Sequence, residues 1–369
     1  MYKDERNGEL KGILTVIVLS VSVLVSGGCR TSTGPLTEDF TEVTPSDFPT
    51  VYAERADCPI DSLASIGLTD VRILSDTLVA LSRQFGTYLV SVHNGQTGEV
   101  ITDLLHVGRG PGEAINAYYL EVSEDSRRFW SKDMWLNAIN VFNVDSILNG
   151  DIMPSERIVL DNVTGAEMSY VLTDSCIYSC PMTSDGSGRF SQYGHDGSLE
   201  RLFGDFPSLR TARNVARHAM PEIFYTNFCA DYANNRFITA DGFMSLITIY
   251  GSDGSIIRNI CGPEDVFSSF NIKGEESGTV RSGSVGWDNP TETYFCVRSY
   301  DGFIYALYRG RFGTWENGAV LVLNPAGDPV IAIAMPEKIN RFDIDPDKGI
   351  IYGINSNFDL CKFRYDTVV

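Results

Sequence analysis

The stretch FDIDPDKGIIYGI, residues 342–354, has the pattern of two short strands joined by a polar turn. Apolar residues alternate with polar ones before the turn, and a second apolar run follows it, which is typical of a β-hairpin. The same pattern returns at residues 71–82, 120–132, 170–180, 228–240 and 294–307. Six copies of one hairpin in a single chain indicate a repeat architecture.

A second hairpin follows each of the first five copies, at residues 89–105, 139–160, 190–203, 246–260 and 320–336. Two hairpins make four strands, and a four-stranded unit that recurs about every 50 residues is typical of a β-propeller blade. A two-sheet sandwich would place the whole chain around one core, and an all-β solenoid needs a shorter period. The sequence therefore predicts an all-β fold, a six-bladed β-propeller of four-stranded blades.

The sixth copy ends early, because only one further strand, at residues 360–366, follows its hairpin. In closed propellers the N-terminal segment supplies the missing outer strand, and residues 48–60 are free to do so. Closure of this kind leaves no unpaired strand edge between the last and first blades. We therefore expect a propeller domain over residues 48–369, closed by an N-terminal strand.

The N-terminal segment has the features of an export signal. An apolar run at residues 13–25 follows three basic residues, and it is too short to span a bilayer. The small residues 26–28 precede Cys29, as in the lipobox of bacterial lipoproteins. We expect a lipoprotein signal peptide over residues 1–28 and a lipid on Cys29, with a plain cleaved signal or an N-terminal membrane anchor as the alternatives.

Residues 29–47 are rich in Thr, Ser and Pro and have no apolar period, which predicts a flexible tether. The formal net charge is -19, with no basic cluster. Such a charge argues against nucleic acid as a partner and against adhesion to anionic lipid. We therefore expect contact with the membrane through the N-terminal lipid only, in the bacterial cell envelope at the outer or inner membrane.

Seven cysteines follow Cys29, so at least one of them has no partner within the monomer. Cys176 and Cys180 lie in an extended run that places their Cα atoms about 13 Å apart, beyond the reach of a disulfide. No pair of cysteines has zinc-ligand spacing with matching histidines. We expect most of these thiols to be small buried apolar groups.

The glycine-rich loop GRGPGE, residues 108–113, lies between the first and second units. A phosphate-binding P-loop would end in Gly-Lys-Ser/Thr, whereas Glu113 and Ala114 stand there. The loop is therefore predicted to shape a turn. With the lipobox and the six repeated units, this G-x-G-P-G-E loop resembles the TolB-like six-bladed propeller lipoproteins of Gram-negative bacteria. The resemblance implies a six-bladed propeller displayed in the envelope and no catalytic residue.

Three aspartates, Asp343, Asp345 and Asp347, alternate as ligands do in a calcium-binding loop. Lys348 stands at the sixth place and Ile354 at the twelfth, where an EF-hand needs Gly and Glu. We interpret this stretch as a turn, with calcium as the alternative.

Two functions remain open. The first is a non-enzymatic binding module, without a cofactor, that docks an envelope protein or peptide, or a glycan, through loops such as that of Arg109 and Glu113. The second is a metal-dependent hydrolase or lyase, acting on a glycan or lactone, with Asp231 or Asp343 as metal ligands in the central channel. No set of catalytic residues can be identified, which favours the first.

Overall fold

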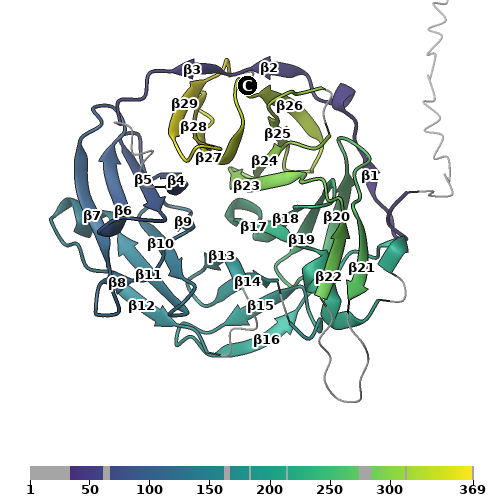
Figure 1. The fold of residues 1–369 in the computed structure, drawn as a ribbon, viewed down its shortest axis with the longest axis horizontal. Helices are drawn as coiled ribbons and strands as arrows, with labels where there is room; N and C mark the ends of the chain where they lie inside the picture. The colour runs from purple at the N-terminus through teal and green to yellow at the C-terminus, as the bar shows by residue number, and fades with distance from the viewer. Residues whose placement is uncertain are drawn as a thin grey trace, which may run out of the picture. The chain divides into compact units, whose positions relative to one another are not determined.

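The computed structural model describes residues 34–60, 67–161, 167–182, 184–212, 215–273, 284–311 and 314–367. Residues from Pro35 onward form one compact unit. Six of its seven β-sheets are arranged as blades around a central channel, as Figure 1 shows, and the seventh is a two-stranded hairpin. The predicted all-β, six-bladed propeller is therefore confirmed.

Each blade is a meander of antiparallel strands. Blade 1 contains β4 (Leu68–Ile73), β5 (Leu78–Arg83), β6 (Tyr88–Asn94) and β7 (Val100–Val107). Blade 2 contains β9 (Leu120–Val122), β10 (Arg128–Asp133), β11 (Ala138–Asn143) and β12 (Glu156–Val159). Blade 3 contains β13 (Glu167–Leu172), β14 (Ile177–Pro181), β15 (Phe190–Tyr193) and β16 (Leu199–Phe203).

The second half of the ring repeats this arrangement. Blade 4 contains β17 (Thr226–Asp231), β18 (Arg236–Asp241), β19 (Leu246–Gly251) and β20 (Ile256–Cys261). Blade 5 contains β23 (Tyr294–Tyr300), β24 (Phe303–Tyr308), β25 (Ala319–Leu323) and β26 (Pro329–Ala334). Blade 6 contains β27 (Ile339–Asp345), β28 (Ile350–Asn355) and β29 (Leu360–Arg364), and takes its outer strand from the N-terminal segment.

The middle strands are largely apolar and buried, because both faces of a blade are covered by its neighbours. All five residues of β25 are buried, for example. Between blades 3 and 4 the ring of Phe190 lies 5.6 Å from that of Phe228 and 4.9 Å from that of Tyr250, measured between ring centres. Each such buried side chain contributes about 1.5–3 kcal/mol, so these layers hold adjacent blades together.

The ring is closed as the sequence predicted. Strand β3 (Glu54–Ala56) pairs antiparallel with β29 and completes blade 6. Upstream, β2 (Thr50–Tyr52) pairs parallel with β26, and β1 (Thr41–Glu42) pairs parallel with β20. The N-terminal segment thus runs along the outer edges of blades 4, 5 and 6 (Figure 1).

One expected boundary needs correction. The flexible tether is predicted for residues 29–47; residues 29–33 lie outside the described residues, and the part from Leu36 onward lies against the propeller. Leu36 is 0% exposed and forms a β-bridge with Leu209, and Thr41 and Glu42 pair with the outer strand of blade 4. The composition is polar, but backbone pairing and a few apolar residues are enough to fix the segment.

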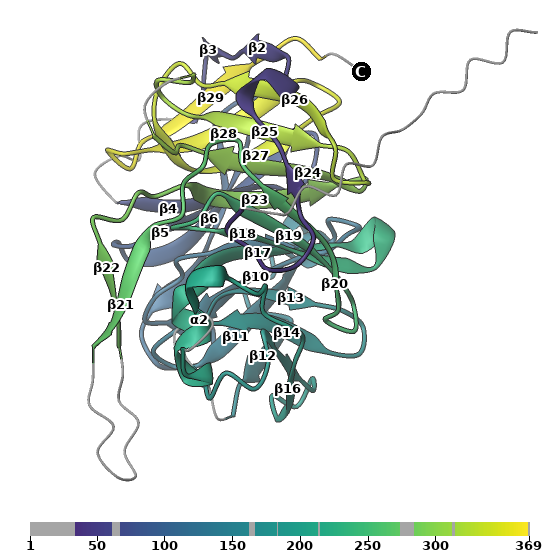
Figure 2. The same cartoon turned by 90° about the vertical axis from the view of Figure 1, so that its right-hand side faces the viewer.

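The two faces of the ring differ in what they carry. The connection face holds the segments that run from the outer strand of one blade to the inner strand of the next, such as residues 115–119, and it faces the viewer in Figure 1. The turn face holds the turns between the first two strands of each blade, such as residues 74–77. Figure 2 shows the hairpin of β21 (Ser269–Lys273) and β22 (Ser284–Asp288) standing off the connection face.

Three smaller elements complete the fold. They are β8 (Glu113–Ala114), α1 (Val144–Leu148) and α2 (Met220–Ile223). Within the described part of the chain, no helix has the length and apolar character needed to cross a membrane.

Candidate functional site

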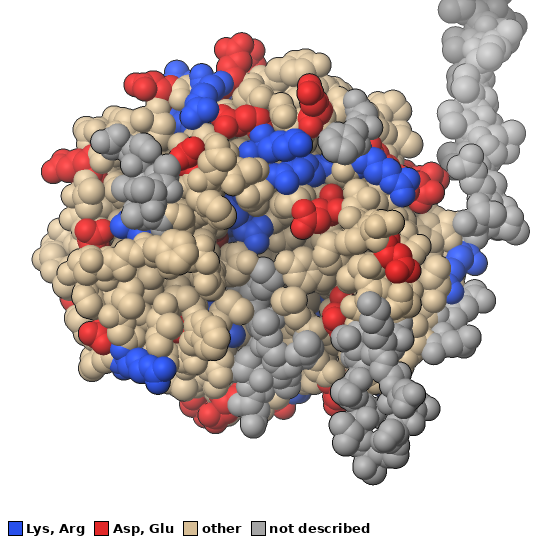
Figure 3. Space-filling view, viewed as in Figure 1, with Lys and Arg blue, Asp and Glu red and all other residues tan. Residues whose placement is uncertain are grey.

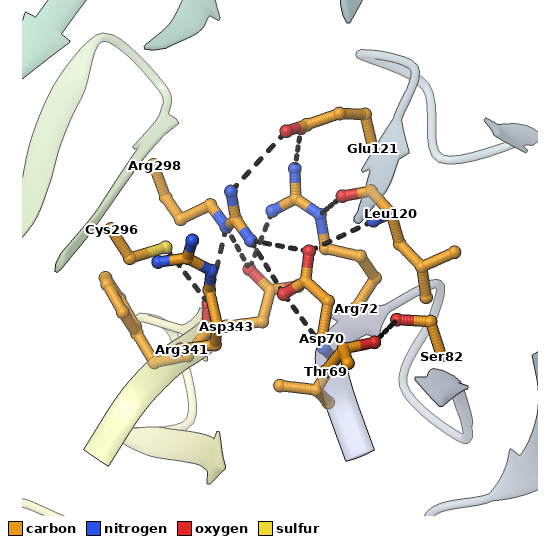
Figure 4. A network of polar contacts seen from close by, with 12 residues as sticks. Thr69, Asp70, Arg72, Ser82, Leu120, Glu121, Cys296, Arg298, Arg341 and Asp343 are labelled. Carbon is orange, nitrogen blue, oxygen red and sulfur yellow. Dashed lines mark hydrogen bonds and ion pairs between the residues drawn. The ribbon is translucent and has the colours of Figure 1, made fainter. Parts of the chain in front are cut away.

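Charged side chains fill the middle of the channel. The inner strands of four blades supply them, namely Asp70 and Arg72 on β4, Glu121 on β9, Arg298 on β23 and Asp343 on β27, and all five are buried (Figure 4). Residues two apart on a strand share a face, which is why β4 presents an acid and a base side by side. We call these five residues the channel layer.

Arg298 and Arg72 connect the carboxylates of the channel layer. Arg298 Nη2 donates to Asp70 Oδ1 at 3.1 Å, and its Nη1 lies 3.6 Å from Glu121 Oε1. Arg72 Nη1 donates to Asp343 Oδ1 at 3.2 Å, and Arg72 Nη2 pairs with Glu121. Blade 5 is not adjacent to blades 1 and 2 in the ring. The ion pairs of Arg298 with Asp70 and Glu121 therefore join non-adjacent blades across the channel.

The carboxylates of the channel layer are also held by the backbone. Asp70 Oδ2 accepts from the amide of Leu120 at 3.0 Å, and Asp343 Oδ2 accepts from the amide of Ile73 at 2.7 Å. Burial disfavours the charged form of Arg72, yet the attraction of Glu121 and Asp343 raises the pKa of its guanidinium above the ordinary value. The layer thus pairs two guanidiniums with three carboxylates, and every member has a partner of opposite charge within it.

Three hollows of different size follow the channel from one face to the other. The hollow at the turn face has a volume of about 140 Å³ and has Arg72 and Arg298 in its wall. The hollow in the middle has a volume of about 10 Å³, which is enough for a single water molecule. The hollow at the connection face has about 390 Å³ and shares Tyr119 and Arg341 with the middle one. The channel layer therefore separates two mouths, and the larger one opens on the connection face.

We call this larger hollow the channel mouth. Its wall consists of Leu68, Thr69, Tyr118, Tyr119, Glu292, Phe295, Arg309, Asn340, Arg341, Ile354 and Phe358. Tyr118 and Tyr119 come from the connection before β9, Phe295 and Arg341 from inner strands, and Phe358 from the turn between β28 and β29. Figure 3 shows the hollow at the centre of this face, with basic side chains gathered beside it. Aromatic rings and arginines thus surround a pocket of the size that binds small ligands.

The two arginines of the channel mouth contact the same two residues. Arg309 Nη2 donates to Asn340 Oδ1 at 2.7 Å, and its guanidinium lies 4.0 Å from the centre of the Phe295 ring. Arg341 Nη1 donates to the carbonyls of Phe295 and Asn340, and its guanidinium lies 5.0 Å from the centre of the Tyr119 ring. The guanidinium groups are therefore stacked on rings and anchored to the backbone.

The glycine-rich loop forms a turn at the outer edge of blade 1, between β7 and β8. Glu113 Oε2 accepts from the amide of Gly110 at 2.6 Å, and Arg157 Nη1 donates to the carbonyls of Gly110 and Glu113 at 3.1 and 3.3 Å. Arg109 is exposed. The structure does not bring Arg109 and Glu113 to the channel mouth, because β8 lies at the rim of the ring (Figure 1).

The three aspartates of the calcium alternative do not converge. Asp343 belongs to the channel layer, Asp345 Oδ2 pairs with Lys348 Nζ at 2.8 Å, and Asp347 is exposed. Asp231 pairs with Arg236 Nε at 2.7 Å. Among the residues that the structure describes, no group of three or more His, Cys, Asp or Glu could hold a metal ion.

Two further expectations concern the cysteines. Cys29 lies outside the described residues. The seven others are thiols, namely Cys58, Cys176, Cys180, Cys229, Cys261, Cys296 and Cys361. All but Cys58 and Cys176 are buried, which confirms the expectation that most of them act as small apolar groups.

Local sequence patterns predict neither the channel layer nor the channel mouth. A signal was present, because Arg72, Arg298 and Asp343 interrupt runs of apolar residues in strands predicted to be buried. A charged residue at such a position needs a buried partner. The sequence alone could not tell which blades would supply the partners.

The sequence matches no protein-family model and no curated protein. The fold is similar to that of three Bacteroides proteins with solved structures. A member of the DUF4221 family from Bacteroides vulgatus is 9% identical, with a TM-score of 0.51 over 86% of this chain and 97% of that chain. A protein of unknown function from Bacteroides thetaiotaomicron is 12% identical, with a TM-score of 0.53 over 86% of this chain and 76% of that chain.

The third, described as a candidate exported protein of Bacteroides fragilis, is 11% identical, with a TM-score of 0.50 over 89% of this chain and 99% of that chain. Identities this low show a shared fold and no more. The resemblance to TolB-like lipoproteins stays a prediction.

Proposed function

We propose that this protein is a non-enzymatic binding module, exported and held to a membrane of the cell envelope by a lipid on Cys29, and that it binds its ligand at the channel mouth. The observation that carries the proposal is the contrast between the two parts of the channel. The charged side chains of the channel layer form ion pairs with one another. The channel mouth, by contrast, is an open hollow of about 390 Å³ whose wall contains aromatic rings and two arginines. A concave, mostly apolar pocket with a few polar groups is the usual form of a binding site.

Export and lipidation are supported by the apolar run at residues 13–25 and the small residues before Cys29. The net charge of -19 supports a partner other than nucleic acid. The candidate partners are an envelope protein or peptide, or a glycan.

The metal-dependent hydrolase or lyase has less support. Its candidate ligands Asp231 and Asp343 are paired with Arg236 and Arg72, so a metal ion would have to displace a guanidinium from either carboxylate. If calcium bound in the channel, it would raise the melting temperature of the folded chain. We expect no such rise.

The test is affinity capture with three forms of the full-length chain. Wild type, Phe358→Ser at the channel mouth and Tyr52→Ser at the outer edge are each cross-linked in cells and recovered in detergent. Phe358 is 45% exposed and Tyr52 is 75% exposed, so the control also removes an exposed ring. We expect an envelope component that wild type and Tyr52→Ser retain and Phe358→Ser loses. Equal retention by all three forms would contradict a site at the channel mouth.

A further inference from the structure

Arginines in the interior of this protein are paired with carboxylates. Arg189 lies 3.4 Å from Asp241, Arg236 lies 2.7 Å from Asp231, and the arginines of the channel layer have the partners described above. The chain has 48 acidic and 29 basic residues, so carboxylates are in excess. A partly buried arginine without an acidic partner therefore leaves an uncompensated positive charge.

Arg309 and Arg341 are such arginines. Their hydrogen bonds go to carbonyls and to the side chain of Asn340, and within the described residues neither makes an ion pair with a carboxylate. Glu292, which is exposed, is the one acidic residue in the wall of the channel mouth. Two guanidinium groups against one carboxylate leave the channel mouth with a net positive charge.

Arg309 also has an unused donor. Its Nε is buried and has no hydrogen-bond partner among the described residues. Burial lowers the pKa of this guanidinium, and the charge of Glu292 opposes the shift only in part. A buried donor without a partner is costly to a folded protein, so the Arg309 side chain is incompletely satisfied where it lies. Since Arg341 contacts the same residues, Asn340 and Phe295, one anionic group can reach both guanidiniums.

The rings around the arginines suggest what carries the anionic group. Tyr118, Tyr119 and Phe358 line the channel mouth. On the same face, the turns between the second and third strands of blades 1 and 2 carry Phe85, 61% exposed, and Trp135, 76% exposed. The turns of three successive blades, 6, 1 and 2, thus carry exposed rings, which offer flat apolar surfaces at and beyond the channel mouth. The C–H face of a sugar ring packs against such a surface, and several rings suit several sugar units.

We infer that the channel mouth binds an acidic glycan, with the carboxylate of a uronic acid between Arg309 and Arg341 and neighbouring sugar units over the exposed rings. The inference rests on the proposed function and adds the class of ligand to it. A guanidinium binds a carboxylate through charge-assisted hydrogen bonds, and within the described residues neither Arg309 nor Arg341 makes an ion pair with a carboxylate. A peptide with a free carboxyl terminus offers the same group, but the flat rings around the channel mouth suit sugar rings better than an extended backbone.

The test is calorimetric titration of the full-length protein in detergent with trigalacturonate. Its methyl ester is the matched control, because it keeps the sugars and removes the charge. Losing one charge-assisted hydrogen bond weakens binding by about tenfold or more. We therefore expect at least that loss for the methyl ester, for Arg309→Gln and for Arg341→Gln. Arg109→Gln removes the same charge from an exposed position at the rim and should leave the affinity within about twofold, because it makes no contact with the ligand.

Several results would overturn the inference. They are equal affinity for acid and ester, unchanged affinity in both arginine variants at the channel mouth, or no binding of trigalacturonate at millimolar concentration. Arg309→Lys keeps the charge and provides a second variant should Arg309→Gln fail to fold. A hexapeptide with a free carboxyl terminus forms another arm. If it bound at the channel mouth and trigalacturonate did not, the ligand class would be wrong and the proposed function would stand. Capture that did not depend on Phe358 would instead contradict the proposed function.

Discussion

Removal of Arg298 should weaken the whole ring, because this side chain joins blade 5 to blades 1, 2 and 6 through the channel. Arg298→Met keeps the length of the side chain and removes the charge. Asp70 and Glu121 then remain buried without the guanidinium that lies 3.1 and 3.6 Å away. Removing one partner of a buried ion pair costs about 3–5 kcal/mol. For a domain of this size that corresponds to a fall in the melting temperature of roughly 5–10 °C.

Thermal unfolding of the full-length protein, followed by circular dichroism, measures the effect. Arg128→Met is the matched control, because Arg128 lies 3.6 Å from the fully exposed Asp174 and such a pair contributes less than about 1 kcal/mol. Adding Asp70→Asn to Arg298→Met should restore part of the stability, since it removes an unpaired buried charge. A melting temperature of Arg298→Met equal to that of Arg128→Met would refute the role assigned to the channel layer.

Three further predictions concern other parts of the fold. Glu113→Ala should lower the free energy of unfolding by about 1 kcal/mol, because a charge-assisted hydrogen bond in the loop is lost. Arg109→Ala should change the free energy of unfolding little, because Arg109 is exposed. Urea titration measures both variants, and equal effects would argue against the role of Glu113 in shaping the turn. Gly98→Ala should lower the melting temperature, because φ is +80° and the added Cβ would lie 2.0 Å from the carbonyl oxygen of Pro59; an unchanged value would argue against that close approach. Burial raises the pKa of Asp241 to about 7, with Arg189 opposing the shift. The unfolded chain releases this proton near pH 4, so the contribution to stability is complete below about pH 4 and is lost as the pH rises through about 7. The melting temperature of wild type should therefore fall more between pH 5 and pH 8 than that of Asp241→Asn, and parallel curves would contradict the raised pKa.

Much of the fold follows from local sequence patterns. The hairpin at residues 342–354 corresponds to β27 and β28, and the missing outer strand of the last blade comes from Glu54–Ala56 in the N-terminal segment. Both features depend on the alternation of apolar residues and on turn chemistry, which act over short distances. The parallel pairing of β1 with β20 and of β2 with β26 could not be predicted, because β1 and β2 are only two and three residues long and show no alternation of apolar residues.

The candidate site depends on contacts between distant residues, so local patterns could not reveal it. Arg298 and Asp70 are 228 positions apart in the chain and meet only because the ring closes. The hollow between Tyr119, Arg309 and Arg341 likewise depends on how blades 1, 2, 5 and 6 meet at the channel. By contrast, the GRGPGE loop is a local structure, in which Glu113 accepts a hydrogen bond from the amide of Gly110.

Site-specific photo-cross-linking in cells tests the central claim most directly. A photoreactive phenylalanine analogue is placed at Phe358, in the channel mouth, or at Glu124, in the wall of the opposite hollow on the turn face. The full-length protein is then irradiated and the adducts are identified by mass spectrometry. The account predicts a ligand adduct at position 358 and none at position 124. Adducts at position 124 alone, or equally at both positions, would contradict a binding site at the channel mouth.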